Sequence, residues 1–493
     1  MPIQRQLVNL GTETEVALRV KVIKKLTDVP DLQPLFSPRS VAVIGASTDP
    51  RKFGGFPIHY TTTRGYKGGL FPVNPTVKTL QGLQSYAGIG DIPGKVDCAI
   101  VSVPASRAEA AIEDCVAGGV RIAVMFSAGY AETGKAGARA QRRLVDIARA
   151  GGLRLLGPNC MGVFNRPLEF YGTFTSSFEH YGGDGFPRAG RTGIVSQSGA
   201  IGIHLMVLLR DRGVGTGKWV TTGNQSDIDV SDCVAWLAGD PETDTIVLYL
   251  EGVPDGDRFA AALARADKAG KPVIVLKSGT SEAGARATRS HTASLAGRDA
   301  VFDGAVRQYG AIRATSMEDL ASIASAFDAG IRPAARTLGV VSISGGAGAL
   351  MADAAADAEL RMPDLALPDR QKLLDIVPFC SPLNPIDTAG PGMTDMDIPL
   401  GFLDVALQSG KYATLALFLT HLGLIDRHWE KLAPGLIARA KEYPDVLLAL
   451  SATATRERQA IMAAAGIPVF VEPVAAIRAL GEVAGFAERH QRR

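Results

Sequence analysis

The amino-acid sequence predicts an α/β protein built from several parallel sheets. Short apolar, β-branched runs alternate with alanine-rich amphipathic stretches along almost the whole chain, which is the pattern of repeated β–α–β units. A chain of 493 residues is too long for one ordinary core, so we expect about three domains. A glycine-rich stretch at 169–189 and a break at 331–333 predict domains at 35–168, 190–331 and 335–493.

Each predicted domain has its own series of strands and helices. In the first we expect strands at 40–44, 70–73, 97–101, 122–125 and 154–156, and helices at 108–117 and 136–150. In the second we expect strands at 192–195, 219–221, 245–250 and 272–276, and helices at 200–210, 230–238, 258–269, 300–309 and 317–329. In the third we expect strands at 338–342, 414–419, 446–450 and 468–470, and helices at 349–358, 456–465 and 474–484. Residues 1–34 are predicted to form a helical N-terminal extension.

The second and third domains open with similar sequences. Gly193-Ile-Val-Ser-Gln-Ser-Gly-Ala-Ile-Gly202 aligns with Gly339-Val-Val-Ser-Ile-Ser-Gly-Gly-Ala-Gly348. In each, a strand runs into Ser-x-Ser-Gly and then into a helix, which indicates a duplicated flavodoxin-like unit. The alternative is chance similarity between two short glycine-rich turns.

Composition excludes several classes of function. Lys and Arg total 52 against 50 for Asp and Glu, and a net charge of +2 gives no reason to expect nucleic acid or a membrane as partner. The five cysteines show no paired spacing, which favours reduced thiols in the cytoplasm over disulfides or a metal centre. No apolar run is long enough to span a bilayer, and the N-terminus lacks a signal-peptide pattern.

A glycine loop after the first strand predicts a nucleotide site. The loop contains Gly45, Ala46, Ser47, Lys52 and Gly54, but it is not the Gly-x-Gly-x-x-Gly of dinucleotide-binding proteins. The second strand ends in Val73-Asn74-Pro75, without the acid that would hold a nicotinamide-nucleotide ribose. Backbone amides, Ser47 and the cations Arg51 and Lys52 suit a nucleotide with an extra ribose phosphate. Val103-Pro104, at the end of the next strand, could line an adenine slot. The alternative is a glycine turn needed only for packing.

Ser196, Gln197, Ser198 and Gly199 predict a phosphate site at a helix start. Free amides, hydroxyls and the helix dipole all favour an anion there, although a plain N-cap would look the same.

His291 is the candidate nucleophile. It is one of only seven histidines and lies in a polar, hydroxyl-rich segment that we expect to be a loop, without metal-ligand spacing nearby. Glu251 closes a probable central strand, where a carboxylate could orient one imidazole nitrogen and make the other more nucleophilic. The alternatives are a surface histidine and an exposed strand-end glutamate.

The combination of motifs resembles the alpha subunits of ADP-forming acyl-CoA synthetases, relatives of succinyl-CoA synthetase. The resemblance covers about residue 35 to the C-terminus and depends on seven segments: Gly45–Gly54, Gly65–Pro75, Gly193–Gly199, Glu251–Val253, Ser281–Thr292, Asn384–Asp387 and Gly466–Phe470. It implies a Rossmann-like CoA-binding domain followed by two flavodoxin-like domains.

The resemblance also implies the reaction acid + CoA + ATP ⇌ acyl-CoA + ADP + phosphate, through an acyl phosphate and a phosphohistidine at His291. It adds Ser127 to the CoA-binding residues proposed above. We find no ATP-grasp segment, so we expect a separate beta subunit that binds ATP or ADP with Mg, and a hetero-oligomer. Ala293 stands where many relatives have Gly. The alternatives are a non-catalytic CoA-binding regulatory subunit, or an acyl or carbamoyl transferase that uses the same phosphate site.

Overall fold

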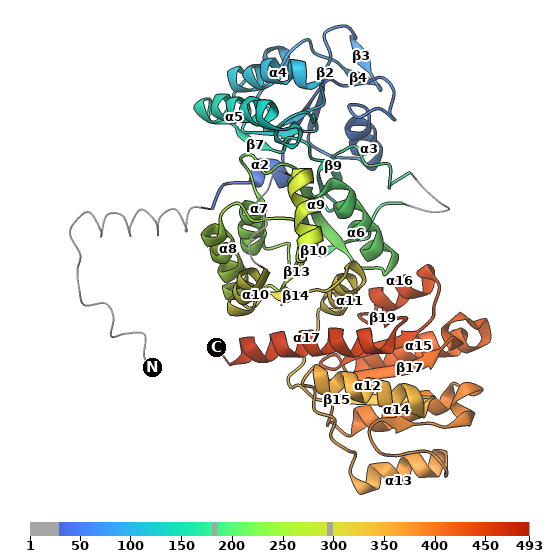
Figure 1. The fold of residues 1–493 in the computed structure, drawn as a ribbon. Helices are drawn as coiled ribbons and strands as arrows, with labels where there is room; N and C mark the ends of the chain where they lie inside the picture. Colours follow the sequence, from blue (N-terminus) through green and yellow to red (C-terminus); the bar gives the residue numbers. More distant parts are fainter. Residues whose placement is uncertain (1–28, 180–184, 293–298, 493) are drawn as a thin grey trace, which may run out of the picture.

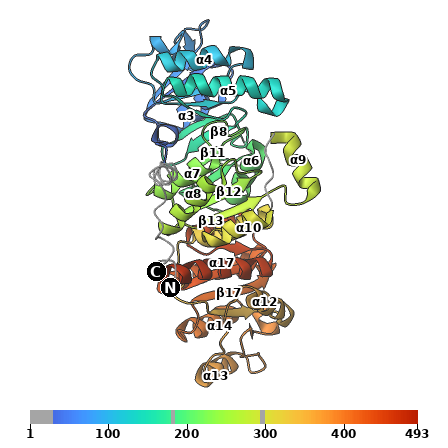
Figure 2. The same ribbon diagram turned by 60° about the vertical axis from the view of Figure 1, so that its left-hand side comes forward.

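Three sheet-containing units follow one another along a single axis in the computed structural model, which describes residues 29–179, 185–292 and 299–492 (Figure 1). The unit drawn in blue and cyan lies at one end, the green and yellow unit lies in the middle, and the orange and red unit lies at the other end (Figure 2). No described helix is long and apolar enough to cross a membrane. The side chains of residues 288–292 lie outside the description.

The first sheet is parallel throughout and has the order β2-β1-β5-β6-β7. Its strands are β1 (Ser40–Ile44), β2 (Gly69–Val73), β5 (Cys98–Val101), β6 (Ile122–Met125) and β7 (Arg154–Leu156). Its helices are α3 (Phe56–Arg64), α4 (Ala105–Ala117) and α5 (Lys135–Ala150), and a small hairpin joins β3 (Thr79–Leu80) to β4 (Leu83–Gln84). The connections leave β1 and β5 in opposite directions, so the loops that follow these two strands flank a crevice where such sheets bind ligands.

The second sheet repeats this order and adds a hairpin. Its parallel strands are β10 (Ala189–Ser196), β11 (Thr216–Thr221), β12 (Thr245–Leu250), β13 (Val273–Lys277) and β14 (Ile312–Arg313). The antiparallel strands β8 (Gly162–Asn165) and β9 (Phe170–Thr173) extend the sheet beyond β11. Its helices are α6 (Gly199–Asp211), α7 (Val230–Gly239), α8 (Gly256–Lys268), α9 (Glu282–Thr292), α10 (Asp299–Gln308) and α11 (Met317–Asp328).

The hairpin of β8 and β9 corrects the predicted boundary between the first two domains. We placed residues up to 168 in the first domain and expected an irregular linker at 169–189. Instead, β8 pairs with β11 of the second sheet, and β9 lies inside the expected linker. Both strands have only four residues, all buried, so neither is long enough to show a clear alternating pattern.

The third sheet has the order β16-β15-β17-β18-β19 and is also parallel. Its strands are β15 (Leu338–Ser342), β16 (Ile386–Asp387), β17 (Thr414–Thr420), β18 (Leu447–Ala452) and β19 (Val469–Phe470). Its helices are α12 (Gly345–Asp357), α13 (Leu367–Ile376), α14 (Asp397–Gln408), α15 (Asp426–Glu442), α16 (Arg456–Ala464) and α17 (Pro473–Gln491). Helix α17 contacts both α11 and α12, and thereby joins the second unit to the third (Figure 1).

The segment that we expected to be a loop around His291 forms α9 as far as Thr292. Alanines 283, 285 and 287 favour a helix, and the Ser281 hydroxyl accepts a hydrogen bond from Gly284 N at the helix start (3.1 Å). The expectation of a loop was therefore wrong for residues 282–292. Ala293 and residues 1–28 of the helical extension predicted for residues 1–34 lie outside the described residues; of residues 29–34, only Gln33 and Pro34 are helical, at the start of α2 (Gln33–Phe36).

Candidate active site

The loop after β1 folds back on itself at the crevice of the first sheet. Gly45 has φ +81°, and a Cβ there would lie 2.3 Å from the carbonyl oxygen of Ser102, which follows β5. A Cβ at Gly54 would lie 2.1 Å from the carbonyl oxygen of Gly45. Only glycine fits at both positions, so the loop can fold tightly against the strand ends. Lys52 is exposed in the same loop.

Four strand ends meet around this loop. Gly45 N donates to Val73 O (3.1 Å), and Asn74 Nδ2 donates to Ala46 O (2.9 Å), which ties the ends of β1 and β2 together. The Ser127 hydroxyl, after β6, donates to Val103 O after β5 (2.5 Å). Gln81 Nε2 donates a hydrogen bond to Ser47 O in the loop (2.9 Å). The neighbouring Pro75 and Pro104 are exposed. The structure therefore gathers the predicted CoA-binding residues around one crevice.

The start of α6 lies at the equivalent crevice of the second sheet. The Ser196 hydroxyl donates to Ser198 O (2.6 Å), and Ser198 Oγ accepts from Ile201 N (3.5 Å) as the N-cap. A Cβ at Gly199 would lie 2.4 Å from Cγ of Met161, so the chain before β8 packs directly on this helix start. Ser196 is fully buried and shapes the turn, whereas Ser198 and Gly199 are partly accessible.

The side chain of Gln197, part of the predicted phosphate site, also bonds to the turn after β12. Its side chain is 3% exposed, and Oε1 accepts hydrogen bonds from Glu251 N (2.8 Å) and Gly252 N (2.9 Å). The side-chain oxygen is therefore committed to the turn after β12. Gln197 fixes the backbone of Glu251 against the start of α6, and this arrangement brings two of the predicted motifs together.

Glu251 is buried next to polar groups of the neighbouring strand end. Glu251 is only 6% exposed. Tyr249 lies two positions before it, on β12. The Tyr249 hydroxyl donates to Ser278 Oγ (3.1 Å). Burial raises the pKa of Tyr249, the bond to Ser278 opposes the rise, and the charge of Glu251 adds to it. The phenol is therefore neutral at neutral pH.

His291 lies in the last turn of α9, and its side chain is outside the described part of the chain. Helix α9 contacts η2 (Ala131–Thr133), the short turn after β6 in the first unit. The helix that contains the candidate nucleophile thus lies against the predicted CoA-binding domain. Within the described residues, no group of three or more His, Cys, Asp or Glu could hold a metal ion.

The third sheet has a matching helix start. The Ser342 hydroxyl donates to Ser344 O (2.8 Å), and Ser344 Oγ accepts from Ala347 N (3.4 Å). A pocket of about 260 Å³ lies there and is lined by Ser342, Ser344, Gly345, Gly348, Ala349, Ser381, Pro385 and Asp387. The similarity that the sequence indicated between 193–202 and 339–348 therefore extends to hydrogen bonding.

Sequence reasoning missed the loop between β11 and α7. Gln225 Nε2 in this loop donates to Gly252 O (3.4 Å), directly after Glu251. Gln225 has a positive φ of 52° and no motif around it. Its role depends on contacts between segments far apart in the sequence, so no local pattern could have indicated it.

Two family models and several known proteins are similar to this chain in sequence or structure. Residues 39–166 match the family described as a CoA binding domain, and residues 189–327 match the succinyl-CoA ligase like flavodoxin domain. The alpha subunit of acetate–CoA ligase (ADP-forming) II from Pyrococcus furiosus is 35% identical over 358 residues, which are 72% of this chain and 76% of that protein. The alpha subunit of isoform I from the same organism is 33% identical over 457 residues, 91% of this chain and 96% of its own length.

A solved structure extends the similarity to three dimensions. The dinucleotide forming acetyl-coenzyme A synthetase 1 of Ca. Korarchaeum cryptofilum, in complex with phosphate and ADP, superimposes with a TM-score of 0.83. The two chains are 31% identical, and the match covers 94% of this chain and 98% of the other. The chain therefore belongs to the family of alpha subunits of the ADP-forming acyl-CoA synthetases.

Proposed function

We propose that this chain is the alpha subunit of an ADP-forming acid–CoA ligase. The reaction is acid + CoA + ATP ⇌ acyl-CoA + ADP + phosphate. Family membership supports the reaction class, and the two crevices supply separate places for the CoA and for the phosphoryl group.

Three displacements account for the reaction in the direction of thioester synthesis. An imidazole nitrogen of His291 attacks the γ-phosphorus of ATP, and ADP leaves. A carboxylate oxygen of the acid then attacks the phosphorus of the phosphohistidine, which restores the imidazole and forms an acyl phosphate. Finally, the CoA thiolate attacks the acyl carbonyl carbon, and inorganic phosphate leaves with the electrons of the broken C–O bond.

The second unit supplies the groups that position the phosphoryl transfer. Glu251 would accept a hydrogen bond from one imidazole N–H, which fixes the tautomer and raises the nucleophilicity of the other nitrogen. The Ser198 hydroxyl and the first amides of α6, from Gly199 onward, would hold the phosphate oxygens. The hydrogen bonds of Ser196 to Ser198 O and of Gln197 to the amides of Glu251 and Gly252 stabilise this geometry.

CoA would bind at the crevice of the first sheet. Backbone amides of the Gly45–Gly54 loop, Ser47 and Lys52 suit its phosphates, because amides and a cation at a strand end favour an anion. The remaining proposed contacts come from the ends of β2, β5 and β6: Val73, Asn74, Pro75, Val103, Pro104 and Ser127.

The partner would be an ATP-grasp beta subunit that binds ATP or ADP with Mg, in a hetero-oligomer. The relatives named as alpha subunits support this partner. Their names give acetate as the acid, so a small carboxylic acid is the proposed substrate class. All five cysteines are free and buried, which is consistent with the proposed cytoplasmic location.

The contact between Gln197 and the Glu251 turn is the observation that supports the proposal most directly, because it joins the backbone of the buried residue Glu251 to the helix start that we propose to bind phosphate. The test uses the chain with a candidate ATP-grasp subunit, a panel of carboxylic acids, and ADP release as the readout. Activity should depend on CoA and disappear in His291→Ala. The chain alone should bind CoA and not NAD; full activity of His291→Ala, or tight NAD binding, would contradict the proposal.

A further inference from the structure

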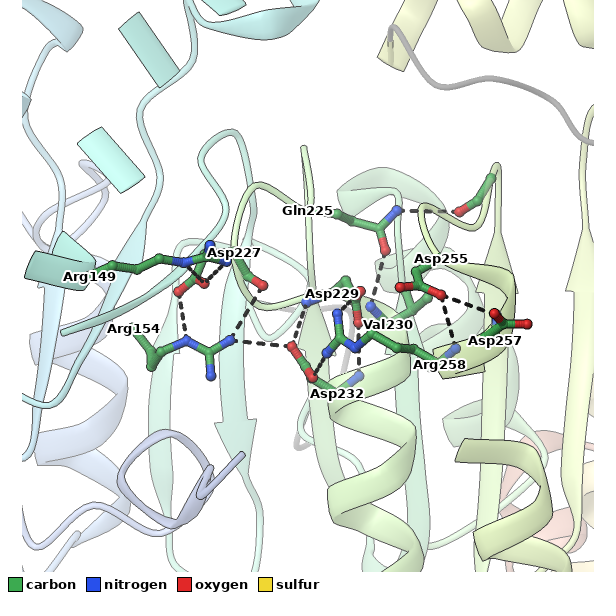
Figure 3. Close-up of polar contacts among 11 residues, drawn as sticks. Arg149, Arg154, Gln225, Asp227, Asp229, Val230, Asp232, Asp255, Asp257 and Arg258 are labelled. Carbon is green, nitrogen blue, oxygen red and sulfur yellow. Dashed lines mark hydrogen bonds and ion pairs between the residues drawn. The ribbon is translucent and has the colours of Figure 1, made fainter. Parts of the chain in front are cut away.

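The loop from Thr222 to Asp229, which we call the strap, connects the first unit to the Glu251 turn (Figure 3). It leaves β11, runs beside the ends of the first sheet and enters α7. The mechanism above uses none of its side chains. One of its sides, however, is bonded to the first unit, and the other is bonded to the Glu251 turn, which the mechanism needs in a fixed position.

Asp227 fixes the strap to the first unit. Its carboxylate accepts hydrogen bonds from Arg149 Nε on α5 (2.8 Å), from Arg154 Nε on β7 (2.8 Å) and from Leu155 N (2.8 Å). The side chain is fully buried. Burial alone would raise the pKa of Asp227, but the bonds from Arg154 and Leu155 N outweigh burial and lower it, so the carboxylate is charged at neutral pH.

Two further residues of the strap bind the first unit near the turn that contacts α9. Asn224 Nδ2 donates to Glu132 Oε2 of η2 (2.6 Å) and to Gln141 Oε1 of α5 (2.9 Å). Ser226 Oγ donates to Gly157 O (2.6 Å). Asn224, Ser226 and Asp227 thus all bond the strap to the first unit, so we expect its position to change if the first unit moves relative to the second.

The other side of the strap contacts the Glu251 turn through Gln225. Its Nε2 donates to Gly252 O (3.4 Å), and its Oε1 accepts from Val230 N at the start of α7 (3.0 Å). The amides of Glu251 and Gly252 are held from the opposite side by Gln197. Two glutamines thus hold the backbone of the turn, one from the phosphate-binding helix start and one from the strap.

The start of α7 gives the strap a rigid base. Asp229 caps the helix, with its Oδ1 accepting from Asp232 N (2.9 Å), and Arg258 on α8 pairs with both carboxylates. Arg154 of the first unit also contacts Asp232 (3.5 Å). Charges from both units therefore converge on three carboxylates that follow Gln225, those of Asp227, Asp229 and Asp232, as Figure 3 shows.

We propose that Gln225 is a positioning residue that makes the orientation of Glu251 depend on how the CoA-binding domain sits on the second domain. The proposal rests on the proposed function, because it assigns Gln225 a role through Glu251. Loss of the Gln225–Gly252 bond should slow phosphoryl transfer to His291. CoA binding should not change, since neither of the bonds described for Gln225 involves the Gly45 loop.

The test uses two variants of Gln225 in the complete complex with the ATP-grasp subunit. Gln225→Met keeps the length of the side chain but removes both bonds, and Gln225→Glu keeps the acceptor for Val230 N but cannot donate to Gly252 O. Both should lower kcat about tenfold and slow the labelling of His291, with the Kd for CoA within about twofold of wild type. If the Met variant does not fold, the Glu variant decides the outcome.

Gln459 provides the matched control. It is half-buried like Gln225, and its Nε2 donates to a single carbonyl, Ala454 O (3.0 Å), in the third unit. Gln459→Met and Gln459→Glu should keep full kcat. Wild-type kcat in both Gln225 variants would overturn the proposal, and so would a parallel loss of CoA affinity and kcat. His291→Ala is measured alongside: if it keeps its activity, the proposed function itself fails, independently of Gln225.

Discussion

The helix starts of the second and third units share a backbone plan and differ in what surrounds it. In both, a serine at the strand end donates to the carbonyl of the N-cap serine, and the N-cap hydroxyl accepts an amide of the first helical turn. Position 197 is Gln in the second unit, whereas its counterpart in the third is Ile343, which is buried in an apolar cluster.

The difference extends to the neighbouring strand. Ser196 is in register with Tyr249 of β12, and Ser342 with Phe418 of β17. Two residues further on stand Glu251 in the second unit and Thr420 in the third. The sheet order and the Ser-x-Ser-Gly turn thus create a helix start in both units, whereas the proposed function gives only the Gln197–Glu251 pair of the second unit the task of orienting an imidazole.

The largest expected effect comes from breaking the pair that only the second unit has. Gln197→Ile copies the residue of the third unit and leaves the amides of Glu251 and Gly252 without their acceptor. We expect the rate of phosphohistidine formation to fall about 100-fold, as measured by rapid quench with labelled ATP. CoA affinity should not change.

Ile343→Gln is the reverse exchange and serves as its control. It buries an amide in the apolar cluster of the third unit, so it should lower stability by about 1–3 kcal/mol but keep the labelling rate. Equal losses of labelling in the two exchanges would mean that the pair has no special role in the second unit.

The next effect concerns the bonds to the first unit, which no residue of the third unit makes in the described part of the chain. Asp227→Asn leaves Arg149 and Arg154 without their buried carboxylate, and because both arginines are partly exposed we expect a loss of about 2 kcal/mol in the free energy of unfolding. Since its pKa is lowered in the folded state, the stabilisation from Asp227 is present above the ordinary carboxyl pKa and disappears as the pH falls below it.

Denaturant unfolding at several pH values measures this effect. Asp404 pairs with Arg439 in the third unit, and its side chain is 38% exposed, so Asp404→Asn should cost less than about 1 kcal/mol. A loss for Asp404→Asn as large as that for Asp227→Asn would show that burial at the unit boundary adds nothing.

The smallest effect compares the two N-caps. Ser198→Ala and Ser344→Ala each remove one acceptor for an amide of the first helical turn, so each should lower stability by about 1 kcal/mol. Ser198→Ala should also reduce labelling of His291, by more than Ser344→Ala does. Equal effects on labelling would remove the distinction between the two helix starts.

The sequence allowed the central strands and the residues at their ends to be predicted, because apolar runs followed by glycine, serine or acid are local patterns. Gly45, Ser198 and Glu251 were found in this way, and in the structure they follow the carboxyl ends of β1, β10 and β12. The relation between the two serine motifs was visible for the same reason. These features depend on a few consecutive residues and on the rule that ligands bind at strand ends.

Features made by distant segments could not be predicted. Gln225 and Asp227 act across a unit boundary, and the polar composition of their loop is typical of any surface turn. The bonds from the Glu251 turn to the side chain of Gln197 could not be predicted either, because no local pattern relates these two segments. Helix α9 was mistaken for a loop because hydroxyl and glycine residues outweighed its alanines in our interpretation.

Labelling of His291 tests the central claim most directly. The complex with the ATP-grasp subunit is mixed with γ-labelled ATP in the absence of acid and CoA, quenched, and digested. We expect one acid-labile, base-stable phosphoryl group on the peptide that contains His291, and no label in His291→Ala. Addition of the carboxylic acid substrate to the labelled complex should remove this phosphoryl group. A label on another residue, or acyl-CoA formation at the wild-type rate by His291→Ala, would contradict the account.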